Sequence, residues 1–309
     1  MLKLKSRTLI TLSLAGLLAV SCGDKKPSIE QLEDELSQAN KNVDEIPKID
    51  EEKVNQILQS IPSPMETAFL LKNKGGEYNK TFLNSTENQK KYTTRYEQAI
   101  NLGIYGTDLA YANIYEMSAD GISYLTTVSS LADDLDIGKY FDLGTLKGLI
   151  NHSDNMDSLL NMTTENFEKI NKHFQETKSS QLSALMLVGG WLEGLNLLNN
   201  VNILSPGSAE LEEKIGEQKI VLAQFMELLR MYDYDPKMKS ITEELAKLEI
   251  LYNDVVIEER EGEQRMEFNP EMGMLELINT TVTIVEVSEE KLKQIDTTTK
   301  AIRKSFIKS

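Results

Sequence analysis

Two long stretches of this 309-residue chain carry almost no charge, although 27% of its residues are charged. In residues 98–115 the only charged residue is Asp108, and in residues 179–209 the only one is Glu193. The few polar residues of the first stretch scatter around a helical projection and form no single polar face. A helix that is apolar on nearly all sides is buried. The sequence therefore predicts that these two stretches form central helices of a multi-helix core.

The rest of the chain also favours helices, mostly with one apolar face. Leu211, Ile215 and Leu222 follow the three-to-four residue spacing of such a face. Asp235-Pro236 marks a break between two helices. Helices are expected at about 63–76, Thr86–Asn101, Ile104–Met117, Ala119–Leu135, Asp142–Ile150, Asp154–Glu176, Ser180–Asn200, Ser208–Met231 and Pro236–Asn253. The expected fold is mainly α, an antiparallel multi-helix assembly of about eight helices or more.

A small β element is expected near the C-terminus. Residues 255–257 and 265–268 flank Glu261-Gly262, which could form a hairpin turn. Thr280–Val287 is dense in β-branched residues, which favour strands. Ser288, followed by two glutamates, is an expected N-cap for a final helix that ends at about Lys304.

The two lone acids, Asp108 and Glu193, allow two interpretations. Each could be a structural acid paired with Arg95, Arg230 or a helix terminus. Alternatively they could line a pocket for a small cationic or polyhydroxyl ligand, since aromatic rings stack on such ligands and carboxylates accept their hydrogen bonds. That candidate pocket comprises Tyr105, Asp108, Tyr111, Trp191 and Glu193.

Glycines interrupt both uncharged stretches. Gly103 and Gly106 open the first, and Gly190 and Gly194 lie in the second. Each costs up to about 1 kcal/mol of helix propensity, which is tolerable where a second helix or a ligand approaches the bare backbone. Gly103, Tyr105 and Leu109 also align with Gly189, Trp191 and Leu195 at an 86-residue offset. Three matches do not establish a duplication, but related halves would place both acids at a shared interface.

The N-terminus is typical of an export signal. Lys3, Lys5 and Arg7 precede a 12-residue, mostly apolar stretch that is too short to span a bilayer stably. The stretch leads to Ser21-Cys22 and resembles the lipobox of bacterial lipoproteins, in which the cysteine is acylated and becomes the mature N-terminus. Cys22 is the only cysteine, so the chain cannot form an internal disulfide. We expect a signal peptide at 1–21, fatty-acid modification at Cys22 and membrane attachment through that lipid, at the outer membrane.

The expected domain organisation follows from these signals. Residues 22–60 would hold the lipidated cysteine, a polar tether and a stalk helix that begins near Ser28, and residues 61–309 would form the helical domain. Loss of the three cations of the signal lowers the formal charge from −16 to −19. Anionic headgroups repel a protein of this charge, so the folded domain should lie away from the bilayer surface.

Three strings add a resemblance: IPSPME from Ile61, NLGIYGTDLAY from Asn101 and GGWLEGL from Gly189. Together with the signal, they resemble a family of uncharacterised, mostly helical bacterial lipoproteins. The resemblance runs from about Ile61 towards the C-terminus. It implies a helical envelope protein, supplies no activity and carries over no catalytic residue.

No motif for catalysis is present. The chain has no phosphate-binding loop, no Gly-x-Ser-x-Gly and no His-Glu-x-x-His, and its acidic balance argues against nucleic-acid binding. We therefore expect no catalytic residues, metal site or cofactor, and a binding or structural module whose small-molecule or protein ligand the sequence does not identify. The alternative is an envelope enzyme, such as a carboxylate-based hydrolase.

Overall fold

The computed structural model describes residues 77–141, 156–269 and 274–308, together with the separate residues 52, 54, 56, 71 and 72. The chain divides into two units, Met1–Lys48 and Ile49–Ser309, and every described residue belongs to the second. The expected signal peptide, Cys22 and the start of the stalk helix therefore lie outside the described residues. So do the helix expected at Asp142–Ile150 and most of the one expected at 63–76.

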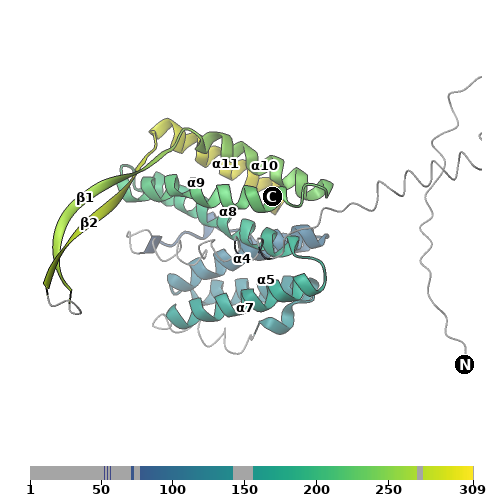
Figure 1. The fold of residues 1–309 in the computed structure, drawn as a ribbon. Helices are drawn as coiled ribbons and strands as arrows, with labels where there is room; N and C mark the ends of the chain where they lie inside the picture. The colour runs from purple at the N-terminus through teal and green to yellow at the C-terminus, as the bar shows by residue number, and fades with distance from the viewer. Residues whose placement is uncertain are drawn as a thin grey trace, which may run out of the picture. The chain divides into compact units, whose positions relative to one another are not determined.

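The described part of the chain is mainly α-helical, a multi-helix assembly with one small antiparallel sheet near the C-terminus, as predicted (Figure 1). Its α-helices are α4 (Arg95–Ile114), α5 (Ser118–Asp134), α7 (Met156–Glu176), α8 (Gln181–Leu204), α9 (Ala209–Arg230), α10 (Pro236–Tyr252) and α11 (Glu289–Ile307). Short 3-10 helices are η1 (Lys80–Phe82), η2 (Thr86–Lys91) and η3 (Gly138–Tyr140), and the strands are β1 (Val256–Asn269) and β2 (Met274–Glu286). A search of the described helices finds none long and apolar enough to cross a membrane.

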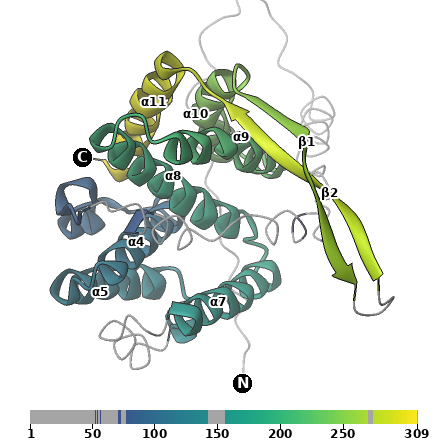
Figure 2. The same ribbon diagram turned by 90° about the vertical axis from the view of Figure 1, so that its left-hand side faces the viewer.

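Helix α8 lies at the centre of the described unit. In two perpendicular views α4, α5 and α7 lie on one side of it, and α9, α10 and α11 lie on the other (Figures 1 and 2). Eighteen residues of α8 are buried, on all sides of the helix, and α4 has thirteen. The prediction that the two uncharged stretches form central helices is confirmed.

Local sequence signals set several helix ends. Thr94 and Glu97 form a capping box at the start of α4, and Asp235 caps α10 just before Pro236. Ser288 accepts a hydrogen bond from the Lys291 backbone at the start of α11, as its predicted N-cap role requires.

One predicted helix boundary is wrong. The sequence suggested separate helices at Thr86–Asn101 and Ile104–Met117, divided near Gly103. Instead η2 ends at Lys91, and α4 runs without interruption from Arg95 through Gly103 to Ile114. The helix-breaking tendency of Gly103 is outweighed by tertiary packing, because this glycine is where another helix meets α4.

The hairpin also differs from its prediction. Strands β1 and β2 pair from Val256 and Glu286 outward to Asn269 and Met274, so the connection comprises residues 270–273, which lie outside the described residues. Glu261-Gly262, the predicted turn, lies within β1 where the register shifts between Glu261 and Gln264. An extra residue in one strand is a β-bulge, which glycine accommodates readily. The prediction of a strand over Thr280–Val287 is confirmed in its main part.

Candidate functional site

Helices α4 and α8 touch backbone to backbone at two glycines. A methyl group on Gly103 would lie 1.9 Å from the Met186 carbonyl oxygen, and one on Gly189 would lie 1.9 Å from the Ile100 carbonyl oxygen. The Thr107 hydroxyl donates a hydrogen bond of 3.1 Å to the Gly190 carbonyl beside them. The close approach of the helices thus requires Gly103, as predicted, and Gly189, which was not among the predicted contact glycines. A methyl group on Gly106, which was also predicted to lie at a contact, would meet nothing within 4 Å.

The two contacts are reciprocal. Gly103 contacts Met186, and Gly189 contacts Ile100. Gly189 follows Gly103 by 86 residues, and Met186 follows Ile100 by the same number, which is the offset noted in the sequence. Tyr96 lies near Gln181 at the start of both helices, and Asp108 lies beside Glu193 further along both. Residue numbers therefore rise together along the contact, and α4 and α8 run in the same direction around a local two-fold relation.

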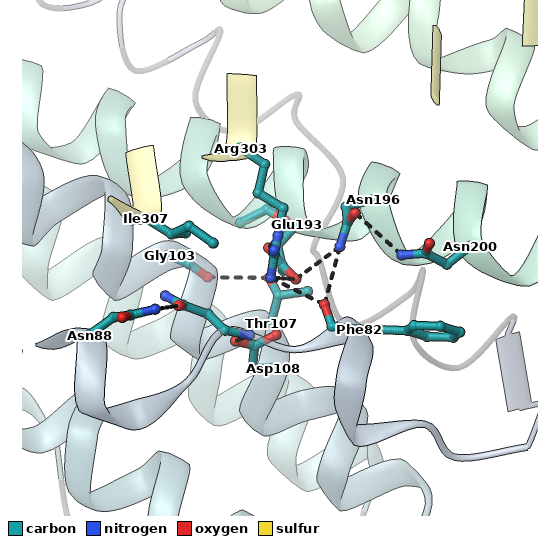
Figure 3. A network of polar contacts seen from close by, with 12 residues as sticks. Phe82, Asn88, Gly103, Thr107, Asp108, Glu193, Asn196, Asn200, Arg303 and Ile307 are labelled. Atoms are coloured by element: carbon teal, nitrogen blue, oxygen red, sulfur yellow. Dashed lines mark hydrogen bonds and ion pairs between the residues drawn. The ribbon is translucent and has the colours of Figure 1, made fainter. Parts of the chain in front are cut away.

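Glu193 of α8 is held by Arg303 of α11, at the far end of the chain (Figure 3). The guanidinium donates from Nε to Oε2 at 2.5 Å and from Nη2 to Oε1 at 2.8 Å, a two-bond arrangement typical of strong pairs. Asn196 donates a further hydrogen bond of 3.2 Å to Oε1. The Glu193 side chain is 0% exposed and that of Arg303 is 13% exposed, so this ion pair is almost completely removed from water.

Asp108 of α4 lies in the same polar cluster and is 0% exposed. Its Oδ2 accepts a hydrogen bond of 3.1 Å from the Asn84 backbone, and its Oδ1 has no hydrogen-bond partner among the described residues. Burial raises the pKa of Asp108 well above its usual value, and the negative charge of Glu193 raises it further, while Arg303 opposes both effects. The surroundings of Asp108 therefore favour its neutral form, while Arg303 pairs directly with Glu193.

Tyrosines and backbone carbonyls enclose this pair. Tyr105 donates to the Ser85 carbonyl at 2.7 Å, and Tyr124 donates to the Asn84 carbonyl at 3.1 Å. Burial raises the pKa of Tyr105, as do Tyr92 and Asp108 beside it, so its hydroxyl keeps its proton. Tyr92 donates to the Ile307 carbonyl at 3.3 Å, which ties the end of α11 to the cluster. These contacts connect α4, α5 and α11 through the segment that contains Asn84 and Tyr92.

The candidate pocket from the sequence is only partly assembled. Tyr105, Asp108 and Glu193 come together, and all five candidate residues are buried. Trp191 instead faces α9, where its Nε1 donates to Gln218 at 2.9 Å and its ring packs against Phe225. Tyr111 stacks on Tyr78 and makes a tilted ring contact with Tyr115, and its hydroxyl donates to the Glu77 carbonyl at 3.3 Å.

The predicted cationic partners of the acids are also wrong. Arg95 donates to the Leu135 carbonyl and lies near Asp136, and Arg230 pairs with Glu249 at 2.7 Å. Sequence reasoning missed Arg303. The sequence does contain an indication of its role. Arg303 follows Ile295 and Thr299 at four-residue spacing, so it lies on the same face of α11 as these two buried residues. A cation on the buried stripe of a helix requires a buried acid as its partner.

The chemistry open to this cluster is limited by its enclosure. Two carboxyl groups beside a guanidinium could exchange a proton, but Arg303 and Asn196 already donate hydrogen bonds to the oxygens of Glu193. Within the described ranges no three His, Cys, Asp or Glu side chains come close enough to hold a metal ion.

A separate cavity of about 490 Å³ lies at the base of the hairpin. Its lining is acidic and apolar, with Ala209, Glu212, Glu213, Asp254, Val256, Val285, Glu286, Val287 and Ser288. Asp254 is paired with Lys291 at 2.7 Å, and this neighbour lowers the pKa of Asp254. The remaining acids give the cavity a negative character, far in sequence from the buried pair.

The chain was also compared with known proteins. No protein-family model, no curated protein and no solved structure matches it.

Proposed function

We propose that the protein is a lipid-anchored protein of the bacterial cell envelope, whose helical domain is a non-catalytic binding or structural module. The anchor is proposed from the sequence alone, because Cys22 ends an export signal and is the only cysteine. The outer membrane is the proposed location. The membrane is then one partner, through the lipid, and a small molecule or a second protein would be the other.

One observation carries the non-catalytic role: the buried carboxyl pair is engaged by the protein itself. Arg303 and Asn196 occupy both oxygens of Glu193, and Asp108 is fully buried beside it. A paired-carboxylate hydrolase needs one acid and one base that both reach the substrate. Ligand sites are also concave and open to their ligand. The enclosure of Asp108 and Glu193 supports a structural role, so we do not propose the envelope enzyme.

The anchor is tested by labelling cells that express the full chain with a radioactive fatty acid. The wild-type protein should take up label and stay with the membranes, because several acyl chains hold a protein there. Cys22→Ser should lose the label and leave the membrane fraction or remain as unprocessed precursor. Cys22→Ser protein that keeps the label would end the lipoprotein proposal.

The structural role is tested with Glu193→Gln. Because this change leaves the Arg303 guanidinium buried without its counter-charge, we expect a loss of about 3–5 kcal/mol of unfolding free energy. Glu243→Gln is the matched control, since Glu243 is exposed on α10 and its loss should change stability by less than about 0.5 kcal/mol. If Glu193→Gln melts at or above the wild-type temperature, the acid belongs to a binding site that trades stability for function.

A further inference from the structure

The hairpin of β1 and β2 has no third strand within the described ranges. The sheet order is β1-β2, so the outer edge of each strand has no pairing partner among the described residues. Figures 1 and 2 show the hairpin extending beyond the helices, with its base beside α9. An isolated two-stranded hairpin is marginally stable in water, and stable sheets have three or more strands or a covering helix.

The two edges differ sharply in charge. Strand β1 carries seven charged residues, five of them acidic, whereas β2 carries only Glu276 and Glu286. Between those two glutamates lie nine uncharged residues, 277–285, and seven of them are β-branched. Charged side chains are a common protection of free strand edges against pairing with another chain. The β1 edge has this protection and the β2 edge lacks it.

We propose that the β2 edge pairs with the β2 edge of a second copy of this chain. Two β2 strands that run antiparallel about a two-fold axis give a four-stranded sheet in the order β1-β2-β2-β1. Such a contact is self-complementary, which is the usual interface of a homodimer. In this segment Val282 is 50% exposed and Thr283 is exposed, whereas Ile284 and Val285, nearer the helices, are half-buried.

Charge selects this pairing over the other arrangements of two copies. The chain has a formal net charge of −16, so contact between most surfaces of two copies is repulsive. Pairing of β1 with β1 would place two strands of net charge −3 side by side. The uncharged segment of β2 avoids this repulsion, and its β-branched residues suit a pleated pairing. The proposal is independent of the lipid anchor.

A cysteine scan tests the pairing in the full chain. Single cysteines are placed along β2 at Thr280, Val282 and Ile284, and along β1 at Glu259 and Arg265 as matched controls. The chain has no other cysteine besides Cys22, which is consumed in the lipidated protein and is replaced in a parallel Cys22→Ser series. Near a two-fold axis, a residue lies opposite its own copy, within reach of a disulfide. After mild oxidation we expect a disulfide-linked dimer that peaks at one β2 position and is missing from β1.

The opposing outcomes are distinct. A scan without a β2 peak, equal cross-linking from β1, or a band that contains a different protein would each overturn the proposal. Val282→Lys provides a second measurement, because a lysine on a strand edge disfavours pairing. Light scattering should show a dimer for the Cys22→Ser chain and a monomer when Val282→Lys is added. Glu259→Lys, on the other strand, should remain dimeric, and a monomer for the unmodified edge would also end the proposal.

Discussion

The contact of α4 with α8 and the hairpin of β1 with β2 both contain a long segment that is almost free of charge. In the helix pair, this segment is covered by other parts of the same chain, and α8 is buried along most of its length. In the hairpin, residues 277–285 belong to a strand whose outer edge no described residue pairs. A long segment without charged residues thus indicates a surface that becomes buried. In the helix pair the same chain buries it, whereas in the hairpin we propose that a second copy does.

The two regions also differ in what fixes their geometry. Gly103 and Gly189 bring two backbones together, and a backbone carbonyl has little freedom to move away. The hairpin rests on α9 through Val285, whose side chain lies where a methyl group on Gly216 would be. Interiors packed to this density respond to a single added or removed group. The helix pair should therefore be sensitive to substitution and the hairpin tolerant of it.

The largest expected effect comes from Arg303→Met. This change leaves Glu193 as a fully buried charge without its partner, which should cost about 3–5 kcal/mol of unfolding free energy in urea denaturation. The double variant Arg303→Met with Glu193→Leu should recover most of this loss, because an apolar pair of similar volume replaces the ion pair.

Lys304→Met is the control for that experiment. Lys304 adjoins Arg303 in α11 but is exposed, so its loss should change stability by less than about 0.5 kcal/mol. If Arg303→Met were as mild as Lys304→Met, the polar cluster would not hold α11 against the core.

The next effect comes from Gly103→Ala. Its methyl group would lie 1.9 Å from the Met186 carbonyl, so α4 and α8 would have to separate, at a cost of about 1–3 kcal/mol. Gly106→Ala in the same helix is the matched control, since nothing lies within 4 Å of a methyl group there. That control should be neutral or more stable by up to about 1 kcal/mol. Thermal melts in which both alanines behave alike would refute the close contact.

Asp108→Asn should act through pH. Burial and the charge of Glu193 raise the pKa of Asp108 above its unfolded value of 3.8, so between these two pKa values the folded protein keeps a proton that the unfolded chain releases. Wild-type stability therefore falls as pH rises through this interval, by at most about 1.4 kcal/mol per pH unit. Asparagine has no such proton. The variant should match the wild type near pH 4 and become the more stable protein at higher pH.

Denaturation midpoints measured from pH 4 upward check this expectation. If Asp108 were charged in the fold, Asp108→Asn would lower stability, because a weaker hydrogen bond would replace a charged one. The structure favours the opposite sign, because Arg303 binds Glu193 instead. A variant that loses stability steadily as pH rises, relative to the wild type, would show that Asp108 is charged in the fold.

Local patterns in the sequence were enough for most of the fold. Apolar spacing, the Asp235-Pro236 break and the Ser288 cap predicted helices that the structure contains, because these signals act within a few residues. The lack of charge around Asp108 and Glu193 predicted their burial for the same reason. Each of these inferences needed only the residues nearby.

The errors arose where a residue serves a distant partner. Gly103 resembled a helix end but lies at the α8 contact, and Gly262 resembled a turn but lies at a bulge. Arg303 is 110 residues from Glu193, and nothing local ranks it above Arg95 or Arg230 as the partner. Choosing among these cations needs the packing of α11 against α8, which is decided by the whole chain.

The smallest effect is expected from Gly216→Ala, at the base of the hairpin. Its methyl group would lie 2.4 Å from Cγ1 of Val285, which is closer than two carbons can approach. Here the obstacle is a side chain on a strand with one free edge, so the strand can shift. Alanine also gains about 0.5–1 kcal/mol of helix stability over glycine in α9. The two effects oppose each other, and the net change should stay within about 1 kcal/mol.

Hydrogen exchange distinguishes this outcome from the response of the helix pair. Gly216→Ala should speed amide exchange in β1 and β2 and leave protection in α4 and α8 unchanged, because regions open separately when few contacts join them. Gly103→Ala should lower protection in the helix pair itself. If Gly216→Ala instead destabilised the whole protein as much as Gly103→Ala, the hairpin base would be as tightly built as the core. The α4–α8 contact, buried by its own chain, and the hairpin, with its unpaired β2 edge, would then not differ in how they respond to substitution.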